Sequence, residues 1–438
     1  MREGIDREPR DVGASPFDAD PRPFLTSLFA AAVAAADPER IVRDHLPPKP
    51  KGRTIVVGAG KGAAQLARAF DEAWDAPLEG MVVTRYGQGV ACPRIAVREA
   101  SHPVPDSAGL AAAAELLAMV GGLSEDDLVV ALICGGGSAL LPSPAPGLSL
   151  ADEIAVNEAL LASGAPISHM NTLRTSISRI KGGRLASAAY PARVVTLVVS
   201  DVPGDDPGLV SSGPTVPSLS SAADALGVVR DYCLQLPPAV LTHLQSEVAA
   251  APSPPKPRLA RCQTRVIASA SRSLEAASAV AQSYGIEAAI LSDAIEGEAR
   301  DVGQVHAALV REIGSRDRPF RKPVLLLSGG ETTVTLTGGD RGRGGRNTTF
   351  LLSFALGITG MSNVWAVAAD TDGIDGSEAN AGAFADGSSI ARMSSAGIDA
   401  RRTLLKNDAW TAFEGIDDLF SPGPTGTNVN DFRAILVR

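Results

Sequence analysis

The chain alternates short apolar runs with longer segments whose apolar positions recur at helical spacing. Short apolar runs predict strands, and several end in a glycine-rich or polar turn followed by a helix-like segment. Strands are expected at 54–57, 80–84, 95–99, 127–133 and 194–199. Strands that alternate with helices form parallel sheets, and such sheets bind ligands beyond the carboxyl ends of their strands. This half of the chain therefore predicts a parallel α/β domain.

A proline-rich stretch at 251–257 interrupts the pattern, and strands and helices alternate again after it. The expected later strands are 265–267, 288–291, 324–327 and 364–368, and the expected helices include 107–120, 152–162, 167–189, 274–284, 299–313 and 349–357. Such a stretch is typical of a domain junction. We therefore predict a mobile arm over residues 1–20 and two domains, 21–255 and 256–438, each with a mainly parallel sheet flanked by helices.

Composition narrows the class of protein. Of 438 residues, 45% are hydrophobic and 20% charged, as in a globular protein, and the net charge of -9 argues against nucleic-acid and anionic-membrane surfaces. The polar N-terminus does not resemble a signal peptide, and no long apolar run predicts a membrane span. The four cysteines form no CxxC pair, which disfavours a zinc site and suits reduced thiols. We expect a cytoplasmic protein; its oligomeric state stays open, with a homodimer as one option.

The first glycine-rich turn, GAGKGAA at 58–64, follows a strand and opens a helix. Gly60 and Ala63 fit the GxGxxA spacing, in which backbone amides and a helix N-terminus face an anion. Lys61 lies inside the turn and could clamp a phosphate or a carboxylate; the alternative is a tight turn with a solvated lysine. The next strand ends in Thr-Arg, without the acid that a dinucleotide site requires, and the P-loop pattern is absent.

Two further predicted strands end in glycine-rich turns. Successive glycines let the backbone approach a ligand without side-chain obstruction. Two such turns suggest the two sides of one anion-binding cleft; the alternative is that each turn only bends the chain. The residues are Gly135, Gly136, Gly137 and Ser138 in the first turn and Gly329, Gly330 and Glu331 in the second.

Aspartates gather after two apolar strands. They are Asp201, Asp205 and Asp206 after the first and Asp370, Asp372 and Asp375 after the second. A kinase needs carboxylates to hold Mg²⁺ near the phosphates and can use one to orient the acceptor hydroxyl. A single loop aspartate more often caps a helix, but two clusters at strand ends beside glycine-rich turns favour function.

Basic residues occur where a transferring phosphoryl group would need them. They are Lys181 and Arg184 in RIKGGRLA and Arg341, Arg343 and Arg346 in a glycine-rich segment. The alternative for the arginines is a solvated loop. His102 and His169 could act as general bases, although a lone histidine is more often structural. Ser138 lacks a GxSxG motif, which disfavours a hydrolase triad.

Together these segments resemble the class II glycerate kinase family, known also for its MOFRL domain. The matching segments, in chain order, are VVGAGKGAA, ASHPVPD, CGGGSALL, SRIKGGRLA, SDVPGDDP, SSGPTVP, LSGGETTV, GRGGRN, AADTDGIDG and GPTGTNVNDF. The resemblance implies ATP- and Mg²⁺-dependent phosphorylation of D-glycerate, usually to 2-phosphoglycerate. It also implies a larger Rossmann-like N-terminal domain and a smaller MOFRL-like C-terminal α/β domain, with the active site in the cleft between them.

Family members depend on the lysine of the first turn and on an arginine of GRGGRN, which fall on Lys61 and on Arg343 or Arg346. The chain departs from the family where Thr348 and Thr349 replace a common Gln-Glu, which leaves nucleotide or metal handling at that point open.

The resulting hypothesis gives each candidate a role. Catalysis falls to Lys61, Asp201, Arg343 and Arg346. ATP contacts fall to Gly60, Gly135, Gly136, Gly137, Ser138, Lys181, Asp205, Gly329, Gly330 and Glu331. D-glycerate contacts fall to Lys61, Ser138, Arg184 and Asp372, and Mg²⁺ contacts to Asp201, Asp205 and Asp370. The rivals are an NAD(P)-dependent hydroxypyruvate reductase that uses the first turn and Arg85, and a non-catalytic sensor of sugar acids or nucleotides.

Overall fold

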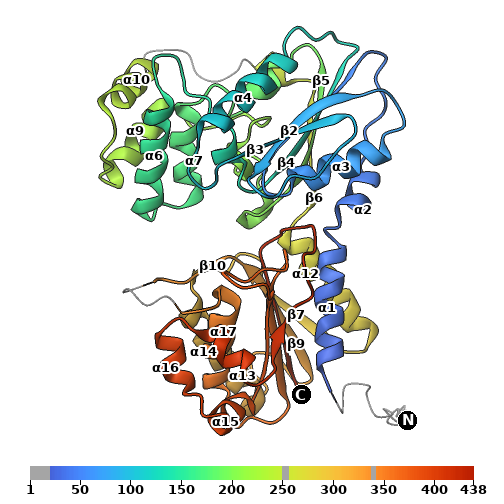
Figure 1. Cartoon of the computed structure of the whole chain (residues 1–438), viewed down its shortest axis with the longest axis vertical. Coiled ribbons are helices and arrows are strands. Elements are labelled where there is room, and N and C mark those ends of the chain that lie inside the picture. Colours follow the sequence, from blue (N-terminus) through green and yellow to red (C-terminus); the bar gives the residue numbers. More distant parts are fainter. Residues whose placement is uncertain (1–19, 249–255, 337–341) are drawn as a thin grey trace, which may run out of the picture.

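The computed structural model describes residues 20–248, 256–336 and 342–438, and it contains two domains, each built on a six-stranded sheet (Figure 1). In the first sheet every pair of neighbouring strands is parallel, as predicted. Its strands, in spatial order, are β3 (Ile95–Ala100), β2 (Glu79–Arg85), β1 (Thr54–Ala59), β4 (Leu128–Cys134), β5 (Arg193–Val199) and β6 (Cys262–Ala268). The strand order reverses between β1 and β4, so the carboxyl ends of these two strands flank the crevice where such sheets bind ligands.

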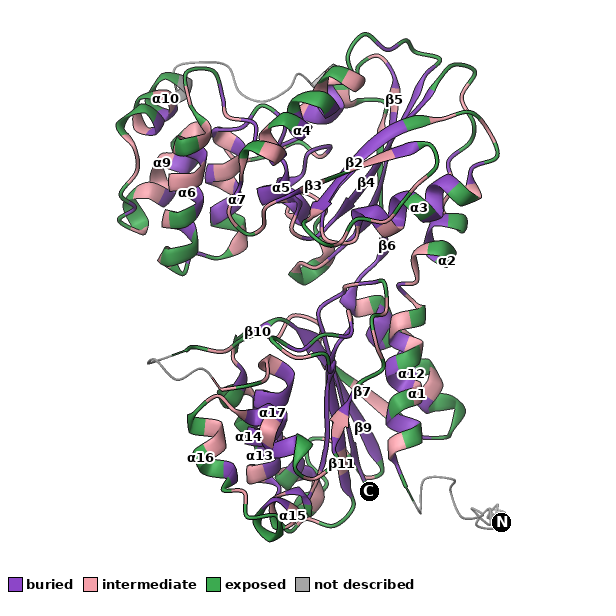
Figure 2. Cartoon of the chain, in the orientation of Figure 1, coloured by how far each residue is buried: buried purple, intermediate pink, exposed green. Residues whose placement is uncertain are grey.

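Both faces of this sheet are apolar, so helices cover both (Figure 2). One face is covered by α2 (Pro38–Arg43) and α3 (Ala63–Ala73), and the other by α4 (Ser107–Met119), α5 (Gly137–Leu140) and α8 (Arg184–Ala188). A further helical layer has its own apolar core and consists of α6 (Leu150–Ser163), α7 (Ile167–Ser176), α9 (Ala222–Asp231) and α10 (Pro238–Val248). Shorter elements are η1 (Pro203–Asp205), η2 (Val210–Ser212) and α11 (Lys256–Leu259).

The single helix expected over 167–189 is wrong, because the chain turns between α7 and α8. Gly182 and Gly183 have φ values of +62° and +82°, a left-handed backbone that glycine adopts without steric cost. The RIKGG segment is therefore a turn beside the sheet instead of a helical stretch.

The second sheet is mainly antiparallel, which corrects the expectation of a parallel one. Only β7 and β9 run parallel among its neighbouring strands. The order is β13 (Leu419–Phe420), β12 (Gly382–Asp386), β11 (Val364–Asp370), β14 (Asp431–Val437), β9 (Val324–Gly330) and β7 (Glu287–Ser292). The last strand of the chain, β14, inserts between β9 and β11 and reverses the local direction.

Helices also cover both faces of the second sheet. One face packs α13 (Ala299–Arg316), α14 (Arg346–Gly357), α15 (Ser389–Ser395), α16 (Ala400–Leu405) and α17 (Ala409–Glu414). The other packs α1 (Arg22–Ala34) and α12 (Ala270–Ser283). A small parallel pair, β8 (Gly297–Glu298) and β10 (Thr332–Thr333), completes this domain.

The two domains exchange elements, so a boundary at residue 255 does not match the sheets. α1 packs on the second domain although it precedes the first, and β6 belongs to the first sheet although it follows the proline-rich stretch. Within the described residues the chain therefore crosses between domains at 35–37 and again at Ser269. Most of the predicted arm and of the 251–257 stretch lies outside the described residues.

Across residues 20–248, 256–336 and 342–438, no helix combines the length and the hydrophobicity needed to cross a bilayer.

Candidate active site

The turns after β1 and β4 meet at the reversal point of the first sheet. The backbone N–H of Lys61 donates to the carbonyl oxygen of Gly135 at 2.8 Å, and Thr84 Oγ1 at the end of β2 donates to the Lys61 carbonyl at 3.2 Å. These bonds fix the Lys61 backbone at the carboxyl edge of the sheet. None of the ion pairs among the described residues involves Lys61, so its ammonium is available to an anion.

The glycines of these turns permit close packing of the protein on itself. Gly60 has φ +137°, and a Cβ there would lie 2.3 Å from the carbonyl oxygen of Cys134. A Cβ on Gly135 would lie 1.7 Å from Oδ2 of Asp201. The missing side chain at position 135 thus makes room for a carboxylate directly against the turn.

Asp201 follows β5 and lies beside Lys61. Burial raises the pKa of its carboxyl to about 6, an effect that the Lys61 charge opposes and the Glu331 charge of the second domain reinforces. Its carbonyl oxygen accepts a hydrogen bond from Asn430 Nδ2 of the second domain at 2.9 Å. Asp201 is therefore a half-buried carboxyl, poised near neutral pH, at the junction of the two domains.

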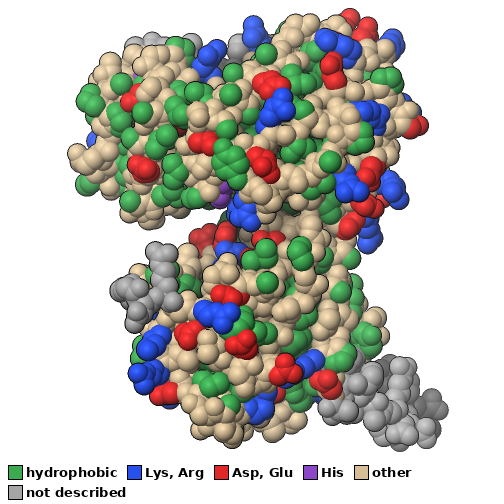
Figure 3. Space-filling model, in the orientation of Figure 1, with side chains coloured by type: hydrophobic (Ala, Val, Ile, Leu, Met, Phe, Trp, Pro, Cys, Tyr) green, Lys and Arg blue, Asp and Glu red, His purple; other side chains and the backbone are tan. Residues whose placement is uncertain are grey.

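Positive groups surround His102 near the same edge. Burial, followed by the charges of Lys61 and Arg85 and a smaller contribution from Arg174, lowers the pKa of His102 to about 4, so the ring is neutral at pH 7. In Figure 3, basic and histidine side chains line the N-terminal domain's side of the gap between the domains, and acidic side chains lie opposite. His169 lies elsewhere, exposed and paired with Tyr232 at 3.1 Å.

Ser138 belongs to a hydrogen-bonded row that the sequence analysis missed. Its hydroxyl pairs with Ser212 at 2.7 Å, and Ser212 donates to Asn171 Oδ1 on α7 at 2.8 Å. Ser211 Oγ accepts from the N–H of Gly137 at 3.0 Å and donates to the Cys134 carbonyl at 2.6 Å. Ser211 and Ser212 belong to the SSGPTVP segment, which the sequence reveals. The contact of Ser212 with Asn171 on α7 could not be predicted from spacing along the chain.

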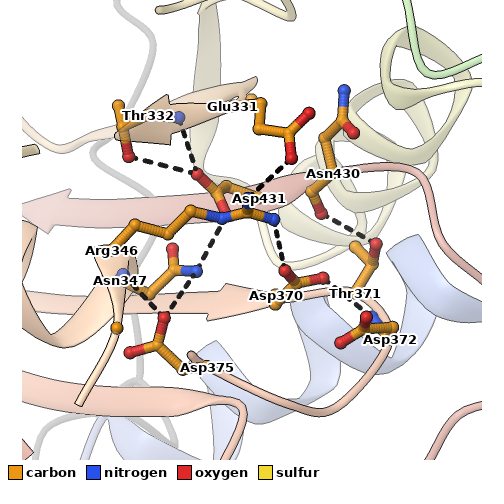
Figure 4. A network of polar contacts seen from close by, with 12 residues as sticks. Glu331, Thr332, Arg346, Asn347, Asp370, Thr371, Asp372, Asp375, Asn430 and Asp431 are labelled. Carbon is orange, nitrogen blue, oxygen red and sulfur yellow. Dashed lines mark hydrogen bonds and ion pairs between the residues drawn. The ribbon is translucent and has the colours of Figure 1, made fainter. Parts of the chain in front are cut away.

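Arg346, at the start of α14, is the centre of the second domain's side of the site (Figure 4). Its guanidinium pairs with Glu331 at 2.7 Å, Asp370 at 2.5 Å and Asp431 at 2.7 Å. Burial lowers the pKa of Arg346, but the three carboxylates outweigh it and raise that pKa. Burial, reinforced by the charges of Asp372 and Asp431, raises the pKa of Asp370 well above its usual range although Arg346 opposes the rise. Asp431 was not among the predicted residues; it begins β14 within the GPTGTNVNDF segment.

Asp375 holds the first turn of α14. Its carboxylate accepts the backbone N–H groups of Asn347 and Thr348, each at 2.9 Å, and the Thr348 hydroxyl at 2.8 Å. This is the cap that orphan N–H groups at a helix start require. One acid of the second aspartate cluster therefore orients Arg346 through the helix, and Thr348 takes part in that cap.

A cleft of about 680 Å³ separates the two sets of residues. Lys61 and Arg85 line it from the first domain, and Glu331, Arg346, Thr349, Asp370 and Asp372 are among its lining from the second. A smaller cavity beside it, lined by Lys61, Gly135, Asp201 and Asn428, shares Lys61 and Asn428 with the cleft. Lys61, Asp201 and Glu331 thus meet in one region.

Several residues that were predicted to contact ATP are instead buried against other parts of the protein. Gly329 and Gly330 are buried, and a Cβ on Gly330 would lie 2.2 Å from the backbone nitrogen of Ile295, so this turn packs against a neighbouring loop. Lys181 is buried and pairs with Glu153 at 2.6 Å.

The remaining predicted basic residues are also held by the protein. Arg184 Nη1 donates to the carbonyl oxygens of Thr175 and Lys181 at 2.8 and 3.0 Å. Arg343 stacks on Trp410, 3.4 Å from the ring centre, and pairs with Glu378 at 2.8 Å. Arg341 lies outside the described residues.

The predicted metal ligands do not form one cluster. Among the described residues, no three His, Cys, Asp or Glu side chains are grouped as a ready metal site. Asp205 lies in η1 with φ +55° and is not among the residues that line the cleft. The carboxylates that do line the cleft are Glu331, Asp370 and Asp372. Such oxygen donors suit Mg²⁺, which commonly binds one or two carboxylates together with substrate phosphates.

Comparison with known proteins matches two family models in chain order. Residues 24–245 match a domain of unknown function, DUF4147, and residues 324–431 match the MOFRL family. An Agrobacterium vitis protein with the provisional name hydroxypyruvate reductase is 51% identical over 96% of this chain and 95% of its own length. A glycerate 2-kinase of Pyrococcus horikoshii is 37% identical over 95% of this chain and 98% of its own. The crystal structure of a glycerate kinase from Thermotoga maritima is 35% identical, has a TM-score of 0.85 and covers 95% of this chain and 99% of that one.

Proposed function

Because this chain belongs to the class II glycerate kinase family, we propose that it transfers the γ-phosphoryl group of ATP to a hydroxyl of D-glycerate, giving 2-phosphoglycerate. The observation that carries the proposal is the meeting of Lys61 and Asp201 with Glu331, Asp370 and Arg346 across the interdomain cleft. Phosphoryl transfer depends mainly on positioning and on cations near the transferred group. This cleft offers a basic wall for anions and an acidic wall for a hydrated metal ion.

Lys61 supplies the positive charge at the reacting phosphoryl group. It lies at the strand-order reversal, its backbone is fixed to Gly135, and its ammonium has no carboxylate partner among the described ion pairs. A lysine so placed can neutralise the charge that the equatorial oxygens gain in the transition state. Neutral His102 nearby adds no competing charge.

Asp201 serves as the base that orients the acceptor hydroxyl. A pKa of about 6 keeps most of the carboxylate ionised at pH 7 yet makes it a better proton acceptor than an ordinary aspartate. Its position against Gly135, where no side chain intervenes, holds it within the turn that Lys61 contacts. Asn430 ties the same residue to the second domain, so approach of the domains also positions the base.

The second domain handles the nucleotide and its metal. Asp370 and Asp372, with Glu331, are the carboxylates that would hold Mg²⁺, which supplies charge neutralisation at the phosphates when bound. Arg346 is already surrounded by three acids, so we assign it a double part: it holds these acids in place, and its exposed edge faces the cleft. Arg343 is not among the residues that line the cleft.

The reductase name of a close relative supports one alternative, an NAD(P)-dependent reduction of hydroxypyruvate. Gly60 and Arg85 would then serve the dinucleotide. The space beside Gly60 is, however, filled by Cys134, and β2 ends in Thr84 and Arg85 without a ribose-binding acid. We therefore favour the kinase.

Phosphorus NMR of a reaction with ATP, Mg²⁺ and D-glycerate tests the proposal. We expect a new phosphomonoester resonance on carbon 2 and ADP formation that requires D-glycerate. Oxidation of NADH or NADPH by hydroxypyruvate, with no glycerate-dependent ADP, would instead establish the reductase.

A further inference from the structure

Arg174 on α7 is a half-buried arginine that lacks a carboxylate partner among the described residues. Its Nε donates to Asn157 Oδ1 at 2.9 Å, and its Nη1 lies 3.5 Å from Asn171 Oδ1. The acid that acts on it electrostatically is Glu153, which is already bound to Lys181 at 2.6 Å. Burial lowers the pKa of Arg174 to about 10. A guanidinium held by two neutral amides in a poorly solvated place carries a desolvation cost, which Glu153, already paired with Lys181, offsets only in part.

A series of polar contacts connects Arg174 to Ser138 in the glycine-rich turn after β4. Asn171, which approaches Nη1, also accepts from Ser212 at 2.8 Å, and Ser212 pairs with Ser138 at 2.7 Å. Arg174 also contributes to the positive field at His102, together with Lys61 and Arg85. The arginine thus belongs to the basic side of the site, next to a row of hydroxyl and amide groups.

The chemistry of this group fits a small hydroxy acid better than a triphosphate. Arg174 is not among the residues that line the 680 Å³ cleft, which has room for a nucleotide. Guanidinium forks bind carboxylates with two parallel hydrogen bonds, and the described hydrogen bonds of Arg174 leave Nη2 unused. Ser138, which is half-buried, offers a partner for a hydroxyl of the same molecule.

We propose that Arg174 binds the carboxylate of the acceptor and so selects hydroxy acids over neutral polyols. The proposal rests on the proposed function for the identity of the acceptor, D-glycerate. It gives Arg174 the part that the sequence suggested for Arg184, whose guanidinium donates to two carbonyl oxygens. The competing account is structural: Arg174 joins α7 to α6 through Asn157.

Two variants and one control separate these accounts. Arg174→Met removes the charge, Arg174→Lys keeps it but loses the fork, and Arg230→Met changes an exposed arginine on α9 of the same helical layer. Calorimetric titration of the nucleotide-free protein with D-glycerate should show affinity reduced about 10- to 100-fold in Arg174→Met, as expected when a hydrogen bond to a charged group is lost. Arg174→Lys should fall between this variant and the unchanged Arg230→Met.

Steady-state kinetics add a readout that a structural defect would not produce. In both Arg174 variants the KM for D-glycerate should rise while the KM for ATP stays within about twofold, because only the carboxylate contact is lost. The preference for D-glycerate over glycerol should shrink by the same factor as the affinity. Equal rises in both KM values, a weaker affinity for ATP alone, or failure of both variants to fold would each overturn the proposal.

The titration also separates this proposal from the proposed function, because it needs no turnover. If the native protein forms no ADP but binds D-glycerate or hydroxypyruvate in an Arg174-dependent way, the kinase is wrong and the carboxylate site stands. If the native protein is a glycerate kinase and Arg174→Met binds D-glycerate as tightly as the native chain does, the carboxylate site is wrong and the kinase stands.

Discussion

Lys61 and Arg346 both line the interdomain cleft, but their surroundings differ sharply. Lys61 projects from the carboxyl edge of a parallel sheet and has no ion pair among the described residues. Arg346 contacts three carboxylates, which lie just after β9, at the end of β11 and at the start of β14. A cation without a protein partner is available to a ligand, and one that is fully paired mainly organises its neighbours. The comparison predicts that loss of Lys61 affects chemistry, while loss of Arg346 affects both chemistry and folding.

Lys61→Ala tests the first half of this contrast and should have the largest effect on activity. We expect kcat to fall about 1,000-fold, within the range for loss of a group that stabilises transition-state charge. The melting temperature should change little, because no ion pair is broken. Steady-state kinetics and circular dichroism measure the two quantities, and near-normal turnover in a folded variant would remove Lys61 from the site.

Arg346→Met tests the other half. Removing one partner from a buried ionic network costs about 3–5 kcal/mol, so urea unfolding at pH 7 should reveal a loss of stability of that size. Without the arginine, the three carboxylates lose their counter-charge, and the pKa of Asp370, which the Arg346 charge lowers, rises further. The deficit should therefore shrink as the pH is lowered and Asp370 becomes protonated. A variant as stable as the native chain at pH 7 would mean that the network is not coupled to folding.

Asp201→Asn tests whether Asp201, which lies beside Lys61 in the first domain, is the general base. General-base loss should lower kcat about 100-fold or more. The native rate should decline as the pH falls through about 6, the pKa of Asp201, and this decline should be absent from the variant. An unchanged acid limb in Asp201→Asn would assign the base to another residue.

The same variant has a predictable effect on stability. A raised aspartate pKa stabilises the folded state below the unfolded value of 3.8, and this contribution is lost as the pH rises through about 6. Above pH 6, Asp201→Asn should therefore be more stable than the native chain by about 1–2 kcal/mol. Urea unfolding at pH 8 measures the difference.

Arg343→Met is the matched control for Arg346 and should have the smallest effect. Its guanidinium stacks on Trp410 and forms a half-exposed pair with Glu378, contacts that contribute little to stability because water screens them. We expect kcat and both KM values within twofold of native. A large loss of turnover here would mean that Arg343 reaches the reacting groups.

The turns at the strand ends show what the local sequence pattern can predict about the site and what it cannot. Lys61, Ser138 and Asp201 were predicted near one another because parallel strands bring their carboxyl ends to one edge, and β1, β4 and β5 are neighbours. Gly330 followed the same pattern but packs against Ile295, which lies in the loop after β7, the strand that runs parallel beside β9. Glycine spacing reports a close approach and does not reveal whether a ligand or the protein itself approaches.

The sequence by itself determined strands β1 to β5 of the first sheet, the lysine-containing turn, the two acidic clusters and the family resemblance, since apolar periodicity and turn residues act over short distances. Tertiary structure decided the central place of β14, the exchange of α1 and β6 between domains, and the position of Arg346, but not Arg343, in the lining of the cleft. It also paired Arg346 with Asp431, 85 residues away, and set Asn171 beside Ser212. Such partners are fixed by which apolar faces pack together, and no local spacing along the chain encodes that choice.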